Sequence, residues 1–389
     1  MNEDRRQQVK ILHVTQTAHG GVGSYLEEML TLQVKRHGAA CVRVVLPREH
    51  AEFFPGLPQE CLLPYNSGKK GRLGSSMRMA ERAMRSVLQW RPDIVHLHAT
   101  FSGCVMRPLL ALLPRPPKII YCAHGWSFER RKANGMVTSS MAAVERHLSR
   151  LCSTVVCVSQ FEAARAQAIG IPASRLRVVA SGLADTPVPP FEGDDALWPS
   201  DAIRVLFVGR LDHEKGVDVL VSAMKILGEK AYAIVVGAAV VAGYKSALDH
   251  PENVRYMGWL NREKIRPLYA TADMLVVPSR YEAFGLSAIE AMRAGLPVIA
   301  SRVGGLPEVV VDHVTGEMVE PGKPDQLAAA ISRMGKAQCR EMGTHARERF
   351  LEAFRIERTV EELGQVYENA LETLVPARPV LVGPVQDTQ

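Results

Sequence analysis

The sequence predicts two α/β domains in tandem, each built from a parallel sheet that is covered by helices. Short apolar runs of strand length alternate with longer stretches of helical periodicity along the whole chain. With 389 residues, the chain is too long for one ordinary core and suits two domains of about 200 residues each. Residues 185–201, rich in proline, glycine and acidic residues, form a linker between the halves.

The individual elements follow from apolar runs and from their spacing. In the first half we expect the strands Val9–Thr15, Cys41–Leu46, Asp93–His98, Lys118–Cys122, Thr154–Ser159 and Leu176–Ala180, with helices over Ser24–His37 and Ser75–Trp90. In the second half we expect the strands Arg204–Val208, Ala231–Val236, Val254–Met257, Met274–Pro278, Pro297–Ala300 and a short Gly316–Val319.

These elements define the expected domain boundaries. An N-terminal domain over residues 1–184 precedes the linker, and a C-terminal domain follows over residues 202–374. We expect the last helix to cross back to the N-terminal domain, and residues 375–389, which are rich in proline, to form a loose tail.

Composition indicates a soluble, cytoplasmic globular protein. Hydrophobic residues make up 47% of the chain and charged residues 23%. The charged start lacks the apolar stretch of a signal peptide, and no apolar run of about 18 residues is present to span a bilayer. The seven cysteines form no Cys-x-x-Cys pair and lie mostly in apolar runs, so we expect reduced thiols.

Charge is distributed unequally between the two halves. Residues 1–180 carry 25 Lys and Arg against 12 Asp and Glu, whereas the remainder carries 22 against 29. Much of the excess lies in Lys69–Arg85, which has two interpretations: a solvated helix face, or a basic amphipathic helix that contacts anionic lipid head groups at the inner face of the membrane. Nucleic acid is excluded as a partner because no basic stripe with interleaved aromatic residues is present.

Two cations follow the first strand of the second half. Arg210 and Lys215 lie in the segment Gly-Arg-Leu-Asp-His-Glu-Lys-Gly, between a buried strand and the helix expected over Val217–Leu227. The positive end of a helix together with two cations is suited to binding a diphosphate.

A second loop of the same half carries two acids at fixed spacing. Glu282 precedes the run Phe284-Gly285-Leu286, whose backbone amides start a helix and suit anionic oxygens. Glu290 lies about one turn inside that helix among apolar neighbours, so its carboxylate needs a polar partner such as a ribose diol.

The first half adds a glycine loop and three histidines. Gly20 and Gly21 follow the first strand, but the spacing is not that of a dinucleotide fingerprint. His124 follows the strand Lys118–Cys122. His96 and His98 alternate on one face of a strand and could bind a metal, but the sequence offers no third ligand, so a polar wall or an acceptor contact is preferred.

Together, the motif Gly-Arg-Leu-x-x-x-Lys-Gly and the later Glu-x7-Glu resemble the retaining glycosyltransferases with the GT-B fold, in which two Rossmann-like domains face a cleft. The resemblance implies that Arg210 and Lys215 hold the donor diphosphate and that His124 and Glu282 border the donor sugar, these four being the catalytic residues. It also implies that the remaining donor contacts come from Gly20, Gly21, Gly258, Phe284, Gly285, Leu286 and Glu290.

The resemblance also implies an activity. A hexose would pass from a nucleoside diphosphate sugar to a sugar or lipid-linked acceptor with retention of configuration, with His98 and His124 on the acceptor side. We expect no cofactor and no metal, since the resembled enzymes need none and the sequence contains no Asp-x-Asp motif.

Some features leave alternatives open. Where the family often has Asn-Gly, the chain has Ser181-Gly182, which bears on a hinge or on a hydrogen bond to the donor. A nucleotide-sugar epimerase of the same fold and a non-catalytic sugar-nucleotide-binding protein remain alternatives.

Overall fold

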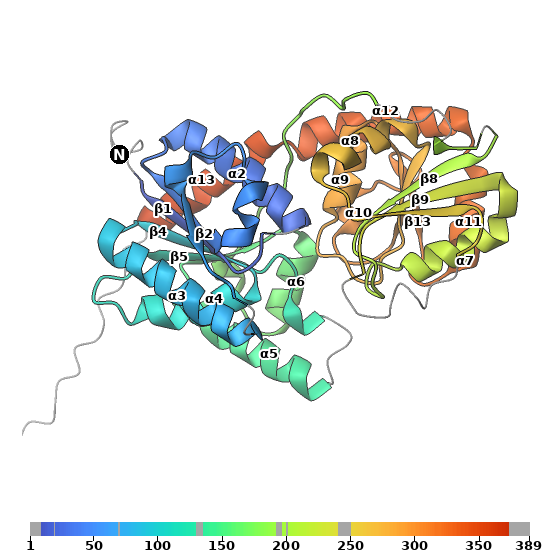
Figure 1. Cartoon of the computed structure of the whole chain (residues 1–389). Coiled ribbons are helices and arrows are strands. Elements are labelled where there is room, and N and C mark those ends of the chain that lie inside the picture. Colours follow the sequence, from blue (N-terminus) through green and yellow to red (C-terminus); the bar gives the residue numbers. More distant parts are fainter. Residues whose placement is uncertain are drawn as a thin grey trace, which may run out of the picture.

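A computed structural model describes residues 9–18, 20–68, 71–129, 135–191, 197–199, 201–239 and 250–372. The chain forms two parallel sheets, each covered by helices, which lie side by side in Figure 1. Several predicted segments lie outside the described residues: Lys69, Lys70, part of the linker and the tail over residues 375–389. The predicted α/β class with two Rossmann-like domains is confirmed.

The first sheet has seven strands in the order β3-β2-β1-β4-β5-β6-β7. They are β1 (Ile11–Thr15), β2 (Val42–Pro47), β3 (Leu62–Tyr65), β4 (Ile94–His98), β5 (Lys118–Cys122), β6 (Thr154–Cys157) and β7 (Leu176–Val178). The helices are α2 (Gly21–His37), α3 (Gly71–Trp90), α4 (Thr100–Ala111), α5 (Gly135–Leu148) and α6 (Gln160–Ala168). Sequence analysis missed β3, a short edge strand that contains Pro64, because proline weakens the strand pattern and is tolerated at an edge.

The second sheet has six strands in the order β10-β9-β8-β11-β12-β13. They are β8 (Ile203–Val208), β9 (Ala231–Val236), β10 (Val254–Gly258), β11 (Met274–Val277), β12 (Val298–Ser301) and β13 (Gly316–Val319). The helices are α7 (Val217–Leu227), α8 (Arg262–Thr271), α9 (Leu286–Arg293), α10 (Leu306–Val309), α11 (Pro324–Arg333), α12 (Lys336–Ala353) and α13 (Ile356–Glu372).

Short 3-10 helices connect some of these elements. They span Arg48–Phe53, Gln59–Cys61, Ser127–Glu129, Ser149–Leu151, Ala173–Arg175 and Gly228–Lys230. Within the described part of the chain, no helix combines the length and the apolar character needed to cross a bilayer.

The end of the chain returns to the first sheet. Helix α13 packs against α2, as Figure 1 shows, and its Tyr367 hydroxyl lies 2.8 Å from His96 Nδ1 on β4. Where the chain crosses, the Leu183 amide donates to the Phe354 carbonyl at 2.9 Å. A Cβ at Gly182 would lie 2.5 Å from the Arg355 carbonyl oxygen, so the crossing requires glycine at this position, whereas Ser181 before it is simply buried.

Candidate active site

Two loops at the carboxyl ends of neighbouring strands bring Lys215 and Glu282 together. Lys215 follows β8 and Glu282 follows β11, and the Lys215 ammonium forms an ion pair with the Glu282 carboxylate. The Lys215 side chain is 23% exposed and that of Glu282 is 12% exposed. Ligands of open α/β sheets bind at this end of the strands, and both charges are accessible there.

Close backbone contacts hold these two loops, and the loop that follows β12, against one another. A Cβ at Gly216 would lie 2.0 Å from the Pro278 carbonyl oxygen, and one at Gly304 would lie 1.7 Å from that of Glu282. The Arg280 amide donates to the Glu214 carbonyl at 2.7 Å. Because only glycine tolerates such contacts at positive φ, the position of the Lys215–Glu282 pair is fixed by backbone packing.

Arg210, the other predicted phosphate-binding cation, has different partners. Its guanidinium lies 3.2 Å from the carboxylates of both Asp212 and Glu214, which are in its own loop. The side chain is 46% exposed, so a diphosphate could reach it. The structure therefore places Arg210 in the same loop as Lys215 but pairs it with acids other than Glu282.

Helix α9 begins opposite the glycine loop of the first domain. Gly285 precedes the helix at φ 113°, and the first amides of a helix have no partner within it. A Cβ added to Gly21, the first residue of α2, would lie 3.1 Å from Leu286 Cδ1, whereas Gly20, at φ 65°, is the residue before the helix. Phe284 is buried against Phe354. The structure thus brings together Gly21 and Leu286, which lie far apart in the sequence.

His124 lies at the end of β5 in a strained backbone conformation. Its φ is 50°, and the following Gly125 has φ 112° and packs near Tyr281 and Ala283 of the second domain. Its Nε2 lies 3.0 Å from His98 Nδ1. Burial lowers the pKa of His124 to about 4, so its imidazole is neutral at pH 7.

His98 and His96 are both inaccessible. His98 is 0% and His96 1% exposed, beneath α2 and α13, and His98 meets the site only through His124. The prediction that they form a polar wall, or that His98 contacts the acceptor directly, is therefore wrong for this structure. The sequence also offered no third ligand, but the fold places His13 of β1 directly beside them.

Glu162, which sequence analysis missed, anchors the His124 loop. Its carboxylate accepts the amides of Gly125 at 2.6 Å and Val158 at 2.9 Å. Burial raises the pKa of Glu162 to about 7, although these two hydrogen bonds oppose the rise. Its place at the start of α6, three residues after the N-cap Ser159, is a capping-box signal that could have found it.

This shift predicts a pH-dependent loss of stability. The folded protein binds the Glu162 proton more tightly than the unfolded chain, whose pKa is near 4.5, so stability falls as the pH rises from 4.5 to about 7. We expect the free energy of unfolding of the wild type to drop by about 2–3 kcal/mol relative to Glu162→Gln across this range. Urea unfolding of both proteins at pH 5 and pH 7 measures this drop. Histidine titration changes the stability of both proteins equally, so it cancels in the difference between wild type and variant. Parallel pH profiles would contradict it.

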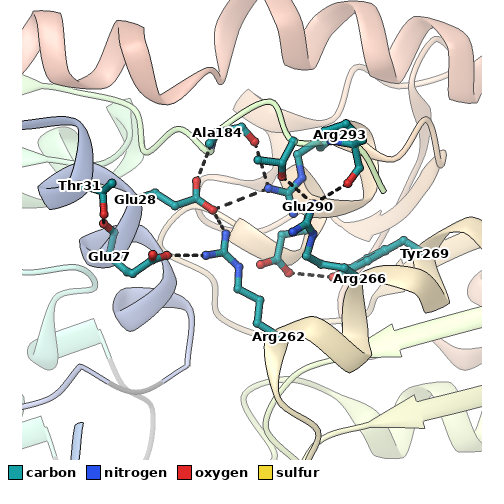
Figure 2. A network of polar contacts seen from close by, with 11 residues as sticks. Glu27, Glu28, Thr31, Ala184, Arg262, Arg266, Tyr269, Glu290 and Arg293 are labelled. Carbon is teal, nitrogen blue, oxygen red and sulfur yellow. Dashed lines mark hydrogen bonds and ion pairs between the residues drawn. The ribbon is translucent and has the colours of Figure 1, made fainter. Parts of the chain in front are cut away.

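An ion-pair network joins the two domains beside Glu290 (Figure 2). Arg262 of α8 contacts Glu28 of α2 and lies 3.0 Å from Glu27 of the same helix. Arg293 donates to the Ala184 carbonyl at 3.1 Å and lies 3.7 Å from Glu28. These charges come from both domains, so the network fixes their relative position in this structure.

Glu290 lies beside this network, where a tyrosine binds its carboxylate. Its carboxylate accepts the Tyr269 hydroxyl at 2.9 Å (Figure 2), and the side chain is half-buried. A neighbouring pocket of about 380 Å³ is lined by residues of both domains, among them Glu27, Arg262 and Arg266. At one edge of the sheet, Gly258 ends β10 at φ 72° and its carbonyl accepts the Gly237 amide at 2.8 Å. Glu290 and Gly258 therefore do not contact the Lys215–Glu282 pair.

Comparisons with known proteins agree across both domains. Family models match residues 19–186 (Glycosyltransferase Family 4) and 191–349 (Glycosyl transferases group 1). An uncharacterized 41.2 kDa protein in the cps region of Klebsiella pneumoniae is 27% identical over 329 residues, 80% of this chain and 86% of that protein.

Solved structures show the same fold. Sucrose-phosphate synthase from Thermosynechococcus elongatus has a TM-score of 0.77 at 24% identity, covering 93% of this chain and 98% of that one. Anabaena HepE in complex with UDP and glucose has a TM-score of 0.79 at 19% identity, covering 93% and 100%.

Proposed function

Because this chain belongs to the glycosyl transferases of group 1 and has the GT-B fold, we propose that it transfers a hexose from a UDP-sugar with retention of anomeric configuration. The observation that carries the proposal is the Lys215–Glu282 pair at the carboxyl ends of β8 and β11. UDP is proposed as the nucleotide because the similarly folded HepE was solved with UDP and glucose.

The proposed chemistry is charge stabilisation. As the sugar–phosphate bond breaks, negative charge develops on the diphosphate, where Lys215, Arg210 and the amides that start α9 stabilise it. Glu282, held by Lys215, binds hydroxyls of the donor sugar, and the leaving phosphate accepts the proton of the acceptor. These cations replace a metal at the diphosphate, so the transfer step is proposed to need none.

The remaining donor contacts surround this centre. We propose that the Glu290 carboxylate, which accepts the Tyr269 hydroxyl in this structure, accepts hydrogen bonds from the ribose hydroxyls when the donor binds. The backbone at Gly258 is proposed to border the base. His124 and the loop at Gly20 and Gly21 close the sugar side from the first domain. The short approach of Gly21 to Leu286 supports a donor enclosed by both domains.

A thermal-shift screen against UDP, ADP, GDP and their glucose conjugates tests the donor assignment. A ligand that binds only the folded state stabilises it by about 2.7 kcal/mol at 100 times its Kd, so UDP should raise the unfolding midpoint. Glu290→Gln should weaken this shift, and the exposed Glu229→Gln should leave it unchanged. If no nucleoside diphosphate stabilises the protein, the donor site is wrong.

The same donors separate the alternative functions. An epimerase would convert a UDP-sugar without an acceptor, and a non-catalytic binding protein would bind UDP-sugar but neither hydrolyse nor transfer it. The glycosyltransferase should release UDP faster when a sugar acceptor is added.

We propose a lipid-linked or polysaccharide precursor as the acceptor, met at an anionic membrane surface. The support is the basic charge of residues 1–180 and the exposed Met77 and Leu88 on α3. However, Arg78 donates to backbone carbonyls at Asn66 and Ser67, and Arg85 pairs with Glu81, so the described part of α3 presents less free positive charge than its sequence suggests.

Vesicle sedimentation tests the membrane proposal. At low salt the protein should sediment with phosphatidylglycerol-containing vesicles but not with phosphatidylcholine vesicles, and 1 M salt should release it, because the Debye length falls to about 3 Å. A protein that stays in the supernatant with both kinds of vesicle at every salt concentration would contradict an anionic surface and favour a small soluble acceptor.

A further inference from the structure

Three buried histidines converge beneath the candidate active site. The register of β1 and β4 sets His13 opposite His96, and His98 follows two residues later on the same face. Each is at most 1% exposed. One ring nitrogen from each residue lies within 4.8 Å of the others, and His13 Nδ1 lies 3.0 Å from His98 Nε2.

The outward-facing ring nitrogens all have oriented partners. His13 Nε2 lies 2.8 Å from Gln33 Oε1, and His96 Nδ1 lies 2.8 Å from the Tyr367 hydroxyl. His98 Nδ1 lies 3.0 Å from His124 Nε2. Metal-binding histidines characteristically bind an oriented partner through their second nitrogen, which fixes the ring and its tautomer.

One of the nitrogens that face the centre of the cluster has no hydrogen-bond partner among the described residues. This atom is His96 Nε2, which is buried. Such an atom costs the folded state free energy unless something binds it.

We propose that His13 Nδ1, His96 Nε2 and His98 Nε2 bind one Zn²⁺ ion, separate from the donor diphosphate. Imidazole suits zinc, whereas Mg²⁺ and Ca²⁺ prefer oxygen ligands, which this cluster does not supply. Tetrahedral bonds of about 2.0–2.1 Å place nitrogens about 3.3 Å apart, so the His13–His98 spacing nearly fits. The third nitrogen, on His96, lies within 4.8 Å of the other two, and water fills the fourth position.

The ion would also set the proton of His124. With zinc on Nε2 of His98, Nδ1 keeps its hydrogen and donates to His124 Nε2, so the His124 proton lies on Nδ1. Without the ion, His13 Nε2 donates its hydrogen to Gln33 Oε1, so His13 Nδ1 must accept a hydrogen from His98 Nε2. His98 Nδ1 then accepts a hydrogen from His124 Nε2. Metal occupancy therefore reverses the hydrogen bond between His98 and His124.

Metal binding is tested directly, without activity. The protein is purified without an affinity tag, stripped with a chelator, and titrated with Zn²⁺, Co²⁺ and Mg²⁺. We expect one Zn²⁺ or Co²⁺ per chain, visible absorption typical of tetrahedral Co²⁺, and a raised unfolding midpoint with Zn²⁺ but not with Mg²⁺. Failure of the stripped wild type to bind one equivalent of either transition metal overturns the proposal and shows a neutral hydrogen-bonded core.

Variants place the ion in the cluster. His96→Gln should abolish one-equivalent binding, and Gln33→Leu, which removes a partner outside the ligand set, should weaken it about 10- to 100-fold. His345→Gln, an exposed histidine on α12, is the matched control and should bind like the wild type. Circular dichroism checks that the variants fold. Full binding by both His96→Gln and Gln33→Leu would place the ion elsewhere and overturn the proposal.

Discussion

Replacing Lys215 with alanine is expected to lower kcat/KM by about 100- to 1,000-fold, as removal of an oxyanion donor does in other enzymes. Lys215 is the cation that contacts Glu282, and its loop is fixed by the close approach of Gly216 to Pro278. Arg210 and Arg280, the other two cationic side chains of these described loops, do not take its place, because Arg210 pairs with Asp212 and Glu214 and Arg280 pairs with Asp218. The loss should appear mainly in kcat, since the charge develops in the transition state.

Initial rates of UDP release from a UDP-sugar, with and without acceptor, measure this effect. Lys230→Ala, which removes an exposed lysine of the same domain, is the control and should retain wild-type rates. Thermal unfolding shows whether Lys215→Ala is folded. If the folded variant turns over at a near-normal rate, Lys215 does not stabilise the leaving group.

Replacing Glu145 with alanine should destabilise the first domain by about 3–5 kcal/mol, because it leaves a buried guanidinium without its counter-charge. Arg107 on α4 is fully buried, and its Nη2 lies 2.7 Å from Glu145 Oε2 on α5. The Tyr121 hydroxyl donates to the same carboxylate at 3.0 Å, and the guanidinium lies 4.0 Å from the centre of the Tyr121 ring. Removing Glu145 breaks its ion pair with Arg107 and its hydrogen bond with Tyr121.

Urea unfolding, followed by circular dichroism, measures this loss. Glu81→Ala is the matched control, since Glu81 forms an exposed pair with Arg85 and such pairs contribute about 0–1 kcal/mol. Replacing the whole pair, as Arg107→Met with Glu145→Leu, should recover much of the stability. If Glu145→Ala loses no more stability than Glu81→Ala, the Arg107–Glu145 pair contributes no more than an exposed ion pair, which contradicts the prediction.

The strands and the donor loops could be predicted from the sequence because their signals are local. The apolar run before Gly209 and the cations after it lie in one short segment, as do Glu282 and the start of α9. Strand β3 was not predicted because it has only four residues, one of them proline, and so shows little of the hydrophobic pattern of a strand. Most of the predicted donor side therefore follows from consecutive residues.

The histidine cluster and the domain interface could not be predicted, because they depend on long-range register. His13 and His96 lie in separate strands, and only the pairing of β1 with β4 makes them neighbours. The sequence did suggest that the last helix crosses back, but not that this crossing places Tyr367 of α13 against His96. In the same way, Arg262 meets Glu28 only once both domains are placed.

The anomeric configuration of the first-formed product tests the proposed transfer most directly. Wild-type protein is incubated with α-linked UDP-glucose or UDP-galactose, first in water alone and then with an alkyl glycoside acceptor, and proton NMR follows the sugar before it mutarotates. Because the departing UDP phosphate, stabilised by Lys215 and Arg210, is proposed to accept the proton of the acceptor, the acceptor attacks on the face that UDP leaves, which predicts an α-configured product. A β-configured product, or no cleavage of any UDP-sugar by a protein that binds UDP, would contradict it.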